Sequence, residues 1–134
     1  MTELNVPRPR WPAFCAEFGR EHHGWRVTLL RAPTPDMEAD PAAALAVAER
    51  LAGEGPLQAL ECSERDHRFH VTVRVGDGED RTVRLQDVIA LHDQRRGRAH
   101  QGLRIDTADG ASVLVAFRAA APPEALDGLA DTEL

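Results

Sequence analysis

The sequence predicts an α+β domain, in which one helix with an aromatic face packs on an antiparallel meander of five or six strands. Two observations support this fold class. A helical repeat of apolar residues lies near the N-terminus, and strand-like alternation of apolar and polar residues follows it. The two patterns together predict a helix layer and a sheet layer around one core. They leave open whether the sheet closes partly into a small barrel.

The helix is predicted to begin at Trp11 and to stop before Gly24. Pro12 suits the first turn, where its missing N–H costs no hydrogen bond, and Gly24 suits the left-handed residue that ends a helix. The residues spaced for one helical face are Trp11, Phe14, Cys15, Phe18 and His22. We expect this face to cover an open sheet. Residues 1–10 hold two prolines and two arginines and are predicted to be an irregular arm.

Period-two alternation predicts the strands. It covers residues 25–29, 57–62, 69–75, 82–92, 103–107 and 113–117. Residues 82–92 fit either one strand bent at Gln86-Asp87 or two short strands. Asp109-Gly110 predicts a tight hairpin between the last two segments.

Residues 11–118 are predicted to form the single domain, interrupted by an alanine-rich helical excursion at residues 36–55. Its helix is expected at residues 41–52, with Asp40 as the N-cap. Residues 119–134 form an acidic tail, which is predicted to be mobile.

Composition narrows the class of protein. The chain has 134 residues, a net charge of −6 and two cysteines, which are too few for a disulfide scaffold. It holds no run of about 18 apolar residues and no signal-peptide core, so we expect a cytoplasmic protein without a membrane partner. Lysine is absent and alanine abundant, which indicates a GC-rich bacterial genome. The acidic balance disfavours nucleic acid as a partner.

The six histidines and two cysteines carry the enzymatic hypothesis. No motif places two histidines on one face at metal-ligand spacing, so no metal or other cofactor is expected. His22 and His70 are the weak candidates for a metal site, and His22 is otherwise expected to cap the helix or to pack under Trp25. Cys15 or Cys62 could serve as a nucleophile beside a histidine, although a buried structural thiol is the simpler interpretation.

One basic cluster stands in the polar segment QRRGRAHQG, which is predicted to be a loop. Its members are Arg95, Arg96, Arg98 and His100. They could bind an anion, an acidic partner or RNA, or they could form solvated ion pairs, with the acidic tail as a ready intramolecular partner. No aromatic residue alternates with them to stack nucleic-acid bases.

The order of these signals resembles a small bacterial family catalogued only as a domain of unknown function. The matching residues are Trp11, Phe14, Phe18, His22, Gly24, Trp25, Pro56, Leu57, Asp109, Gly110 and Phe117. The resemblance covers residues 11–118 and departs at residues 41–52, which look inserted. It implies a fold and no chemistry. Residues 83–117 are also similar in rhythm to pleckstrin-homology-like small barrels.

Two functions from different classes therefore follow from the sequence. The preferred hypothesis is a non-enzymatic binding or regulatory module, with a protein partner or a second copy of the chain at a sheet edge or at the basic cluster. The alternative is a small metal- or thiol-dependent enzyme that uses the histidines and Cys15 or Cys62. Neither a catalytic constellation nor a ligand is identified by the residues alone.

Overall fold

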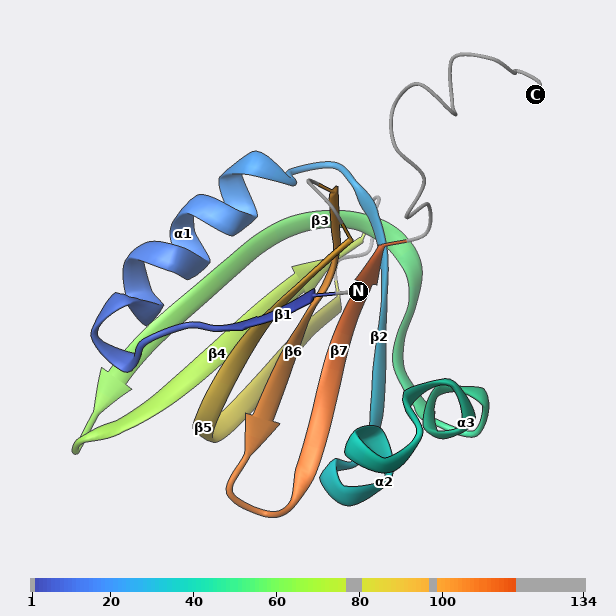
Figure 1. Ribbon diagram of the computed structural model, residues 1–134. Coiled ribbons are helices and arrows are strands. Elements are labelled where there is room, and N and C mark those ends of the chain that lie inside the picture. The colour runs from blue at the N-terminus through green and yellow to red at the C-terminus, as the bar shows by residue number, and fades with distance from the viewer. Residues whose placement is uncertain (1, 77–80, 97–98, 118–134) are drawn as a thin grey trace.

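The computed structural model describes residues 2–76, 81–96 and 99–117 (Figure 1). Its elements are β1 (Thr2–Asn5), η1 (Arg8–Arg10), α1 (Trp11–Glu21), β2 (Arg26–Pro33), α2 (Thr34–Ala39), α3 (Pro41–Ala46), β3 (Glu49–Arg65), β4 (Arg68–Val75), β5 (Arg81–Arg96), β6 (Ala99–Thr107) and β7 (Ala111–Phe117). None of the described helices has the length and hydropathy that crossing a lipid bilayer requires.

The strands form one antiparallel sheet in the order β1-β5-β4-β3-β2-β7-β6, and β5 also pairs with β6. This extra pairing joins six of the strands into a ring of neighbours. It is made by the length of β5, whose first half pairs with β4 and whose second half pairs with β6. The predicted α+β class, with a helix on an antiparallel sheet, is therefore confirmed, and the ring closes the sheet in part.

The predicted bend in β5 is present, because one strand continues through residues 86 and 87 with a shift in its pairing to β4. Leu85 and Val88 are both buried, although three positions separate them. Asp87 lies between them with φ +54° and forms the extra residue of a bulge. The hairpin at Asp109-Gly110 is also confirmed, with Gly110 at φ +89°.

The helix α1 lies along β3 on the inner face of the sheet (Figure 1). It begins and ends where the sequence predicts, and Gly24 follows it with φ +86°. Trp11, Cys15 and Phe18 are each at most 2% exposed. Gly19 allows the close approach, because a Cβ atom there would lie 3.0 Å from the backbone nitrogen of Leu60.

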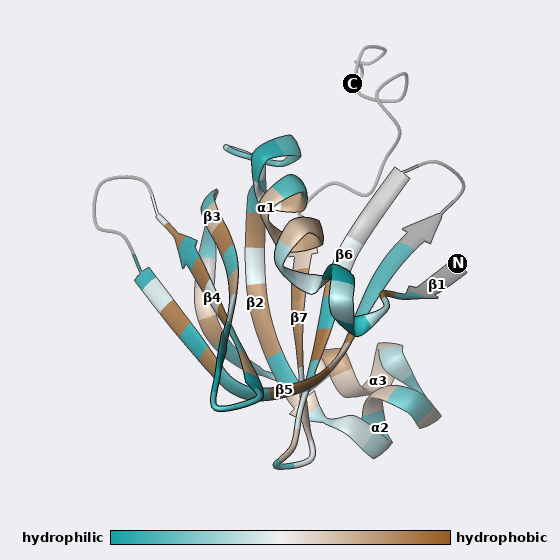
Figure 2. Ribbon diagram, turned by 90° about the vertical axis from the view of Figure 1, so that its left-hand side faces the viewer, coloured by the Kyte–Doolittle hydropathy of each residue, from teal (hydrophilic) through white to brown (hydrophobic). Residues whose placement is uncertain are grey.

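The core fills the space between α1 and the ring of strands. Hydrophobic residues alternate with hydrophilic ones along β4 and β5, as Figure 2 shows by their colour. The aliphatic core residues under α1 include Val27, Leu29, Leu57, Leu60, Val71, Val73, Leu91, Leu103, Ile105 and Val115. At the C-terminal end of α1, the Phe18 ring stacks 5.7 Å from that of Phe117. The His22 ring lies edge-on to Trp25 at 4.7 Å, as predicted.

A smaller apolar cluster lies on the outer face of the sheet, where α2 and α3 cover β2 and β7. It contains Ala32, Met37, Ala44 and Leu114. Asp40 caps α3 as predicted, accepting a hydrogen bond from the backbone nitrogen of Ala43 at 3.3 Å.

The prediction of a helical excursion at residues 36–55 is wrong for the second half of that range. The helix α3 ends at Ala46, and β3 begins at Glu49. The edge of β2 needs a hydrogen-bonding partner there, and residues 49–56 supply it. Ala52 is buried in the main core, so tertiary pairing outweighs the helix propensity of an alanine-rich segment.

The arm at residues 1–10 is more ordered than predicted. Its first residues form β1, which pairs with the second half of β5 and accounts for the strand beyond the expected five or six. The arm continues with a bond from the Val6 nitrogen to the Leu91 carbonyl at 2.9 Å. The Trp11 indole then donates to the Val6 carbonyl at 2.8 Å, which ties the arm to α1.

The two phenylalanines of α1 form a matched pair for testing this packing. Phe18 is buried and Phe14 is only half-buried on the same helix. We expect Phe18→Ala to lower the free energy of unfolding by about 3–5 kcal/mol through lost burial and a residual cavity. Phe14→Ala should cost about 1–2 kcal/mol. Urea denaturation followed by circular dichroism measures both values, and equal losses would contradict this seating of α1.

Candidate functional site

The basic cluster predicted from the sequence falls mainly in strands rather than in a loop. Arg95 and Arg96 end β5, and they pair in register with His100 and Ala99 at the start of β6. These residues extend the β5–β6 pairing, because their backbone N–H and C=O groups gain hydrogen-bonding partners in the sheet. Arg98 lies outside the described residues, as do the side chains of Arg95, Arg96 and His100. Their binding role, like the mobility of the acidic tail, stays a prediction.

The structure does not bring His22 and His70 together. The Nδ1 atom of His22 lies 2.8 Å from the Phe18 carbonyl inside the core. His70 lies on β4, where its Nδ1 atom accepts a bond of 3.4 Å from the backbone nitrogen of Asp87. Within the part of the chain that the structure describes, no three histidine, cysteine or carboxylate side chains are placed to hold a metal ion.

A polar cluster on the outer face of β5, β6 and β7 was missed at the sequence level. Its members are Thr34, Glu38, His92, Arg104, Asp106 and Ser112. Asp106 is at its centre and is almost fully buried. One of its carboxylate oxygens accepts from Arg104 Nε at 2.9 Å and from Ser112 at 2.6 Å. The other accepts from Arg104 Nη2 at 3.0 Å and lies 3.1 Å from His92 Nε2. Four contacts therefore saturate the acceptor sites of one carboxylate.

The electrostatics of Asp106 exclude it as a base near neutral pH. Burial acts to raise its pKa, but hydrogen bonds from His92, Arg104 and Ser112 and the Arg104 charge outweigh burial and hold the pKa well below its usual range. The Ser112 hydroxyl has a single proton and donates it to Asp106. The Thr34 hydroxyl must therefore donate to Ser112 across their 2.8 Å separation. Because the histidine contacts the carboxylate rather than the serine, the arrangement is no nucleophile–base pair.

The polar cluster instead fastens α2 to the sheet. Thr34 and Glu38 both come from α2, and the Glu38 carboxylate reaches Arg104 Nη2 at 3.4 Å. In sequence, Arg104 and Asp106 alternate with Leu103 and Ile105, which is the pattern of an ordinary solvent-facing strand. Only the covering helix makes these charges buried, and no local signal shows that cover.

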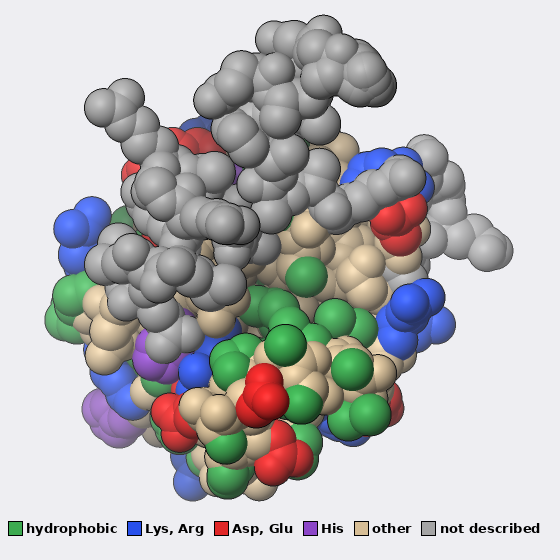
Figure 3. All heavy atoms as spheres, turned by 45° about the vertical axis from the view of Figure 1, so that its right-hand side comes forward, with side chains coloured by type: hydrophobic (Ala, Val, Ile, Leu, Met, Phe, Trp, Pro, Cys, Tyr) green, Lys and Arg blue, Asp and Glu red, His purple; other side chains and the backbone are tan. Residues whose placement is uncertain are grey.

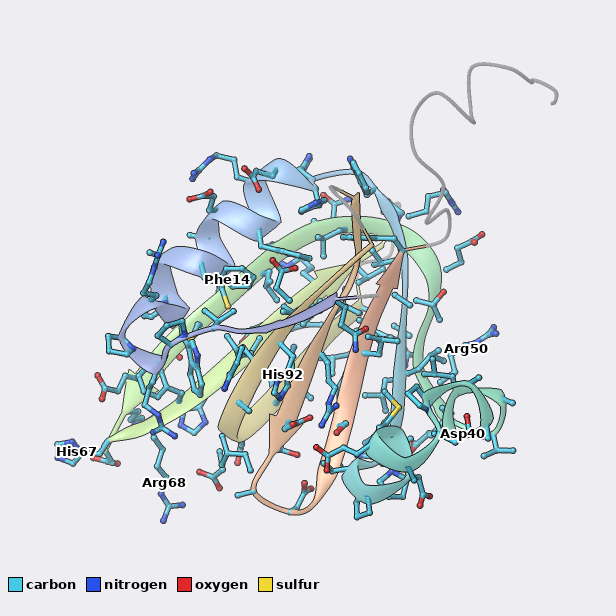
Figure 4. The ribbon with its side chains drawn as sticks, in the orientation of Figure 1. Phe14, Asp40, Arg50, His67, Arg68 and His92 are labelled. Carbon is cyan, nitrogen blue, oxygen red and sulfur yellow. The ribbon has the colours of Figure 1, made fainter. Side chains whose placement is uncertain are left out.

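A pocket of about 260 Å³ opens at the other side of the molecule, between η1, the β3–β4 turn and the bulge of β5. Its apolar wall consists of Phe69, Val88, Ile89 and Ala108, and its polar rim of Arg8, His67, Arg68 and Asp87. Figure 4 shows His67 and Arg68 projecting from the β3–β4 turn, on the side of the molecule opposite Arg50. The concave shape, apolar wall and few polar groups are typical of a ligand site.

Arg8 is the most informative residue of this pocket. Its guanidinium carbon lies 5.0 Å from the centre of the Trp11 ring and 5.4 Å from that of Phe69. Those two rings pack edge to face at 4.9 Å. No carboxylate among the described residues pairs with Arg8, and cation–π contacts with these two rings hold it at the rim.

The turn that carries His67 is strained. Arg65 pairs with Arg68, and the two residues between them, Asp66 and His67, have φ +54° and φ +64°. These angles fit the two-residue turn that matches strand twist, which asparagine and glycine fill at lowest cost. A histidine there pays a penalty of about 1–2 kcal/mol. Strained residues of this kind are concentrated at functional positions.

Asp87 links this pocket to a second one of about 300 Å³, which Arg31, Arg84 and Asp109 also line. Four arginines and two aspartates therefore line the two pockets, although the chain is acidic as a whole. Arg31 pairs with Glu49, and Arg68 pairs with Asp87 at 3.3 Å. Both pairs are exposed, so separating them costs little.

A third surface covers α2 and α3, where hydrophobic side chains gather with acidic ones among them (Figure 3). Most are alanines, and the larger Val47 is 85% exposed. Small side chains of this type offer little area to anchor a partner. The aromatic wall and the arginine held over it single out the Arg8 pocket instead.

No family model matches the chain, and no curated protein or solved structure is significantly similar to it. The resemblance to a bacterial family therefore stays a prediction, and function has to be argued from the geometry.

Replacing Asp106 tests the polar cluster. Asp106→Asn removes the negative charge that Arg104 and His92 face, so we expect a loss of about 3–5 kcal/mol of unfolding free energy at pH 7. The exposed partner provides the control, because Glu38→Gln should cost less than about 1 kcal/mol.

The pH dependence of this loss has a definite sign. Because folding lowers the pKa of Asp106, its contribution is complete above the unfolded carboxyl pKa of about 4 and declines as the pH falls below it. Denaturation at a series of pH values should therefore show wild type and Asp106→Asn converging in acid. Parallel profiles would show that Asp106 does not carry this electrostatic role.

Proposed function

We propose that this protein is a non-enzymatic binding module and that the Arg8 pocket takes a small anionic ligand with an apolar or aromatic body. The observation that carries the proposal is Arg8, a cation held over two aromatic rings at the mouth of a pocket and paired with no described carboxylate. An anion there gains a charge-assisted hydrogen bond without breaking an existing ion pair.

The shape of the pocket supports the chemistry of the ligand. Phe69 and Val88 are buried and form a rigid apolar wall, while Ile89 remains 53% exposed beside them. Arg8, Arg68 and His67 stand at the rim as donors. A volume of about 260 Å³ suits a molecule with one ring and one anionic group. Among the described residues that line the pocket there is no serine, threonine or cysteine, so the lining offers no hydroxyl or thiol nucleophile.

Binding of phenyl phosphate, followed by calorimetry at low ionic strength, tests the proposal. We expect saturable binding by the wild type, with a dissociation constant on the order of 1 mM or below for so small a ligand. Arg8→Gln should weaken it about tenfold, because a charge-assisted hydrogen bond is lost. Arg50→Gln, on the opposite side of the molecule, is the matched control. Equal weakening by both variants, or no saturable binding, would overturn the proposal.

The substitution His67→Gly tests whether His67 binds the ligand or serves only in the turn. His67→Gly relieves the left-handed strain, so we expect the unfolding free energy to rise by about 0.5–1 kcal/mol. The same variant loses the imidazole at the rim and should bind phenyl phosphate several-fold more weakly. Thermal denaturation and calorimetry on one sample measure both effects. A more stable protein with unchanged affinity would make His67 a turn residue only.

A further inference from the structure

The two cysteines belong to two elements that pack directly on each other. Cys15 lies on α1 and is fully buried, whereas Cys62 lies on β3 and is half-buried. Cys62 pairs in register with Val71 and Leu60 with Val73, so both face the inner side of the sheet together with those buried valines. Cys62 packs against the core cluster that contains Cys15.

The register of α1 on β3 sets the two thiols opposite each other. One turn after Cys15, Gly19 lies against Leu60. One turn before Cys15, the Trp11 ring contacts Phe69, which pairs with Glu64. Cys62 is the inward-facing residue between Leu60 and Glu64. Four helical residues advance by about 6 Å and two strand residues by about 6.6 Å, so this matching brings Cys15 over Cys62.

We infer that Cys15 and Cys62 form a redox pair, which hydrogen peroxide converts reversibly into a disulfide between α1 and β3. Both sulfurs are free thiols in this structure. The inference does not depend on ligand binding at the pocket, because it uses neither Arg8 nor the rim of that pocket.

The two thiols differ in pKa and in accessibility, and this difference determines which of them reacts first. Interaction with the Cys15 thiol lowers the pKa of Cys62, despite the opposing effects of burial and of the Glu64 charge. The same interaction, together with burial, raises the pKa of Cys15. Cys62 is thus the more accessible thiol and the one that ionises first, and a thiolate is the reactive form.

The reaction balances in two steps. The Cys62 thiolate attacks one peroxide oxygen, the O–O bond breaks, and the departing hydroxide takes a proton and leaves as water. The product is a sulfenic acid on Cys62. The Cys15 sulfur then loses its proton and attacks the Cys62 sulfur, the S–O bond breaks, and hydroxide leaves with that proton as a second water. Two thiols are oxidised by two electrons, and one peroxide is reduced to two waters.

Intact mass spectrometry of the full chain tests this pair. The reduced protein is treated with equimolar hydrogen peroxide and then with dithiothreitol. We expect a monomer lighter by two hydrogen atoms, peptides cross-linked through Cys15 and Cys62, and full reversal by the reductant. The cross-link closes a loop over residues 15–62, so the melting temperature should rise by on the order of 10 °C. Disulfide-linked dimers, or oxidation to sulfinic acid without a cross-link, would overturn the inference.

Single variants test the order of reaction. In Cys15→Ser, Cys62 should form a sulfenic acid that dimedone traps. In Cys62→Ser, the buried Cys15 should stay unmodified under the same treatment. The wild-type mass measurement stands without these variants if either fails to fold. If dimedone labelled Cys15 in Cys62→Ser faster than it labelled Cys62 in Cys15→Ser, the assigned roles of the two thiols would be contradicted.

Discussion

The packing of α1 on the inner face of β3 is the constraint on which the other features of this fold depend. Two backbone hydrogen bonds of 2.8 Å join Leu57 to Gly24 and Trp25 where the helix ends. Gly19 lets the helix approach the backbone of Leu60, and Trp11 packs edge-on against Phe69. Because the helical and strand repeats nearly match, one register fixes all three contacts. The aromatic support of Arg8 and the meeting of the two cysteines both follow from it.

The buried and the exposed charged side chains have different roles in this molecule. The Arg104–Asp106 pair lies about 5–7% exposed, and four contacts fill the acceptor sites of the Asp106 carboxylate, so the pair contributes position and register. The pocket arginines are the opposite case. Arg68 is mostly exposed in a weak pair with Asp87, and Arg8 lies over the Trp11 and Phe69 rings with no ion pair to a described carboxylate. Their charge remains available to an incoming anion, because little is lost when it is redirected.

The sequence predicted the parts of the fold that carry their own local signal. The aromatic repeat of α1, the left-handed Gly24 and the hairpin at Asp109-Gly110 all belong to this class. The short strand β1 has too few residues to show alternation, and only β5 makes it a strand. The buried state of Asp106 depends on the cover that α2 provides, and the meeting of Cys15 with Cys62 depends on the register of a helix on a strand. Asp66-His67 lacks the glycine that marks such a turn, so the pocket rim gave no signal either.

The pocket and the cysteine pair are connected through Trp11 and Phe69, and this has a thermodynamic consequence. Trp11, which supports Arg8, precedes Cys15 by one helical turn, and Phe69 is two residues from Val71, the partner of Cys62. A cross-link that fixes this end of α1 on β3 reduces the freedom of the aromatic support beneath Arg8. If that rigidity favours the bound state, linkage requires the ligand to favour the disulfide by the same factor. If oxidation leaves affinity unchanged, the two sites are energetically separate despite their short connection, and the helix transmits no strain between them.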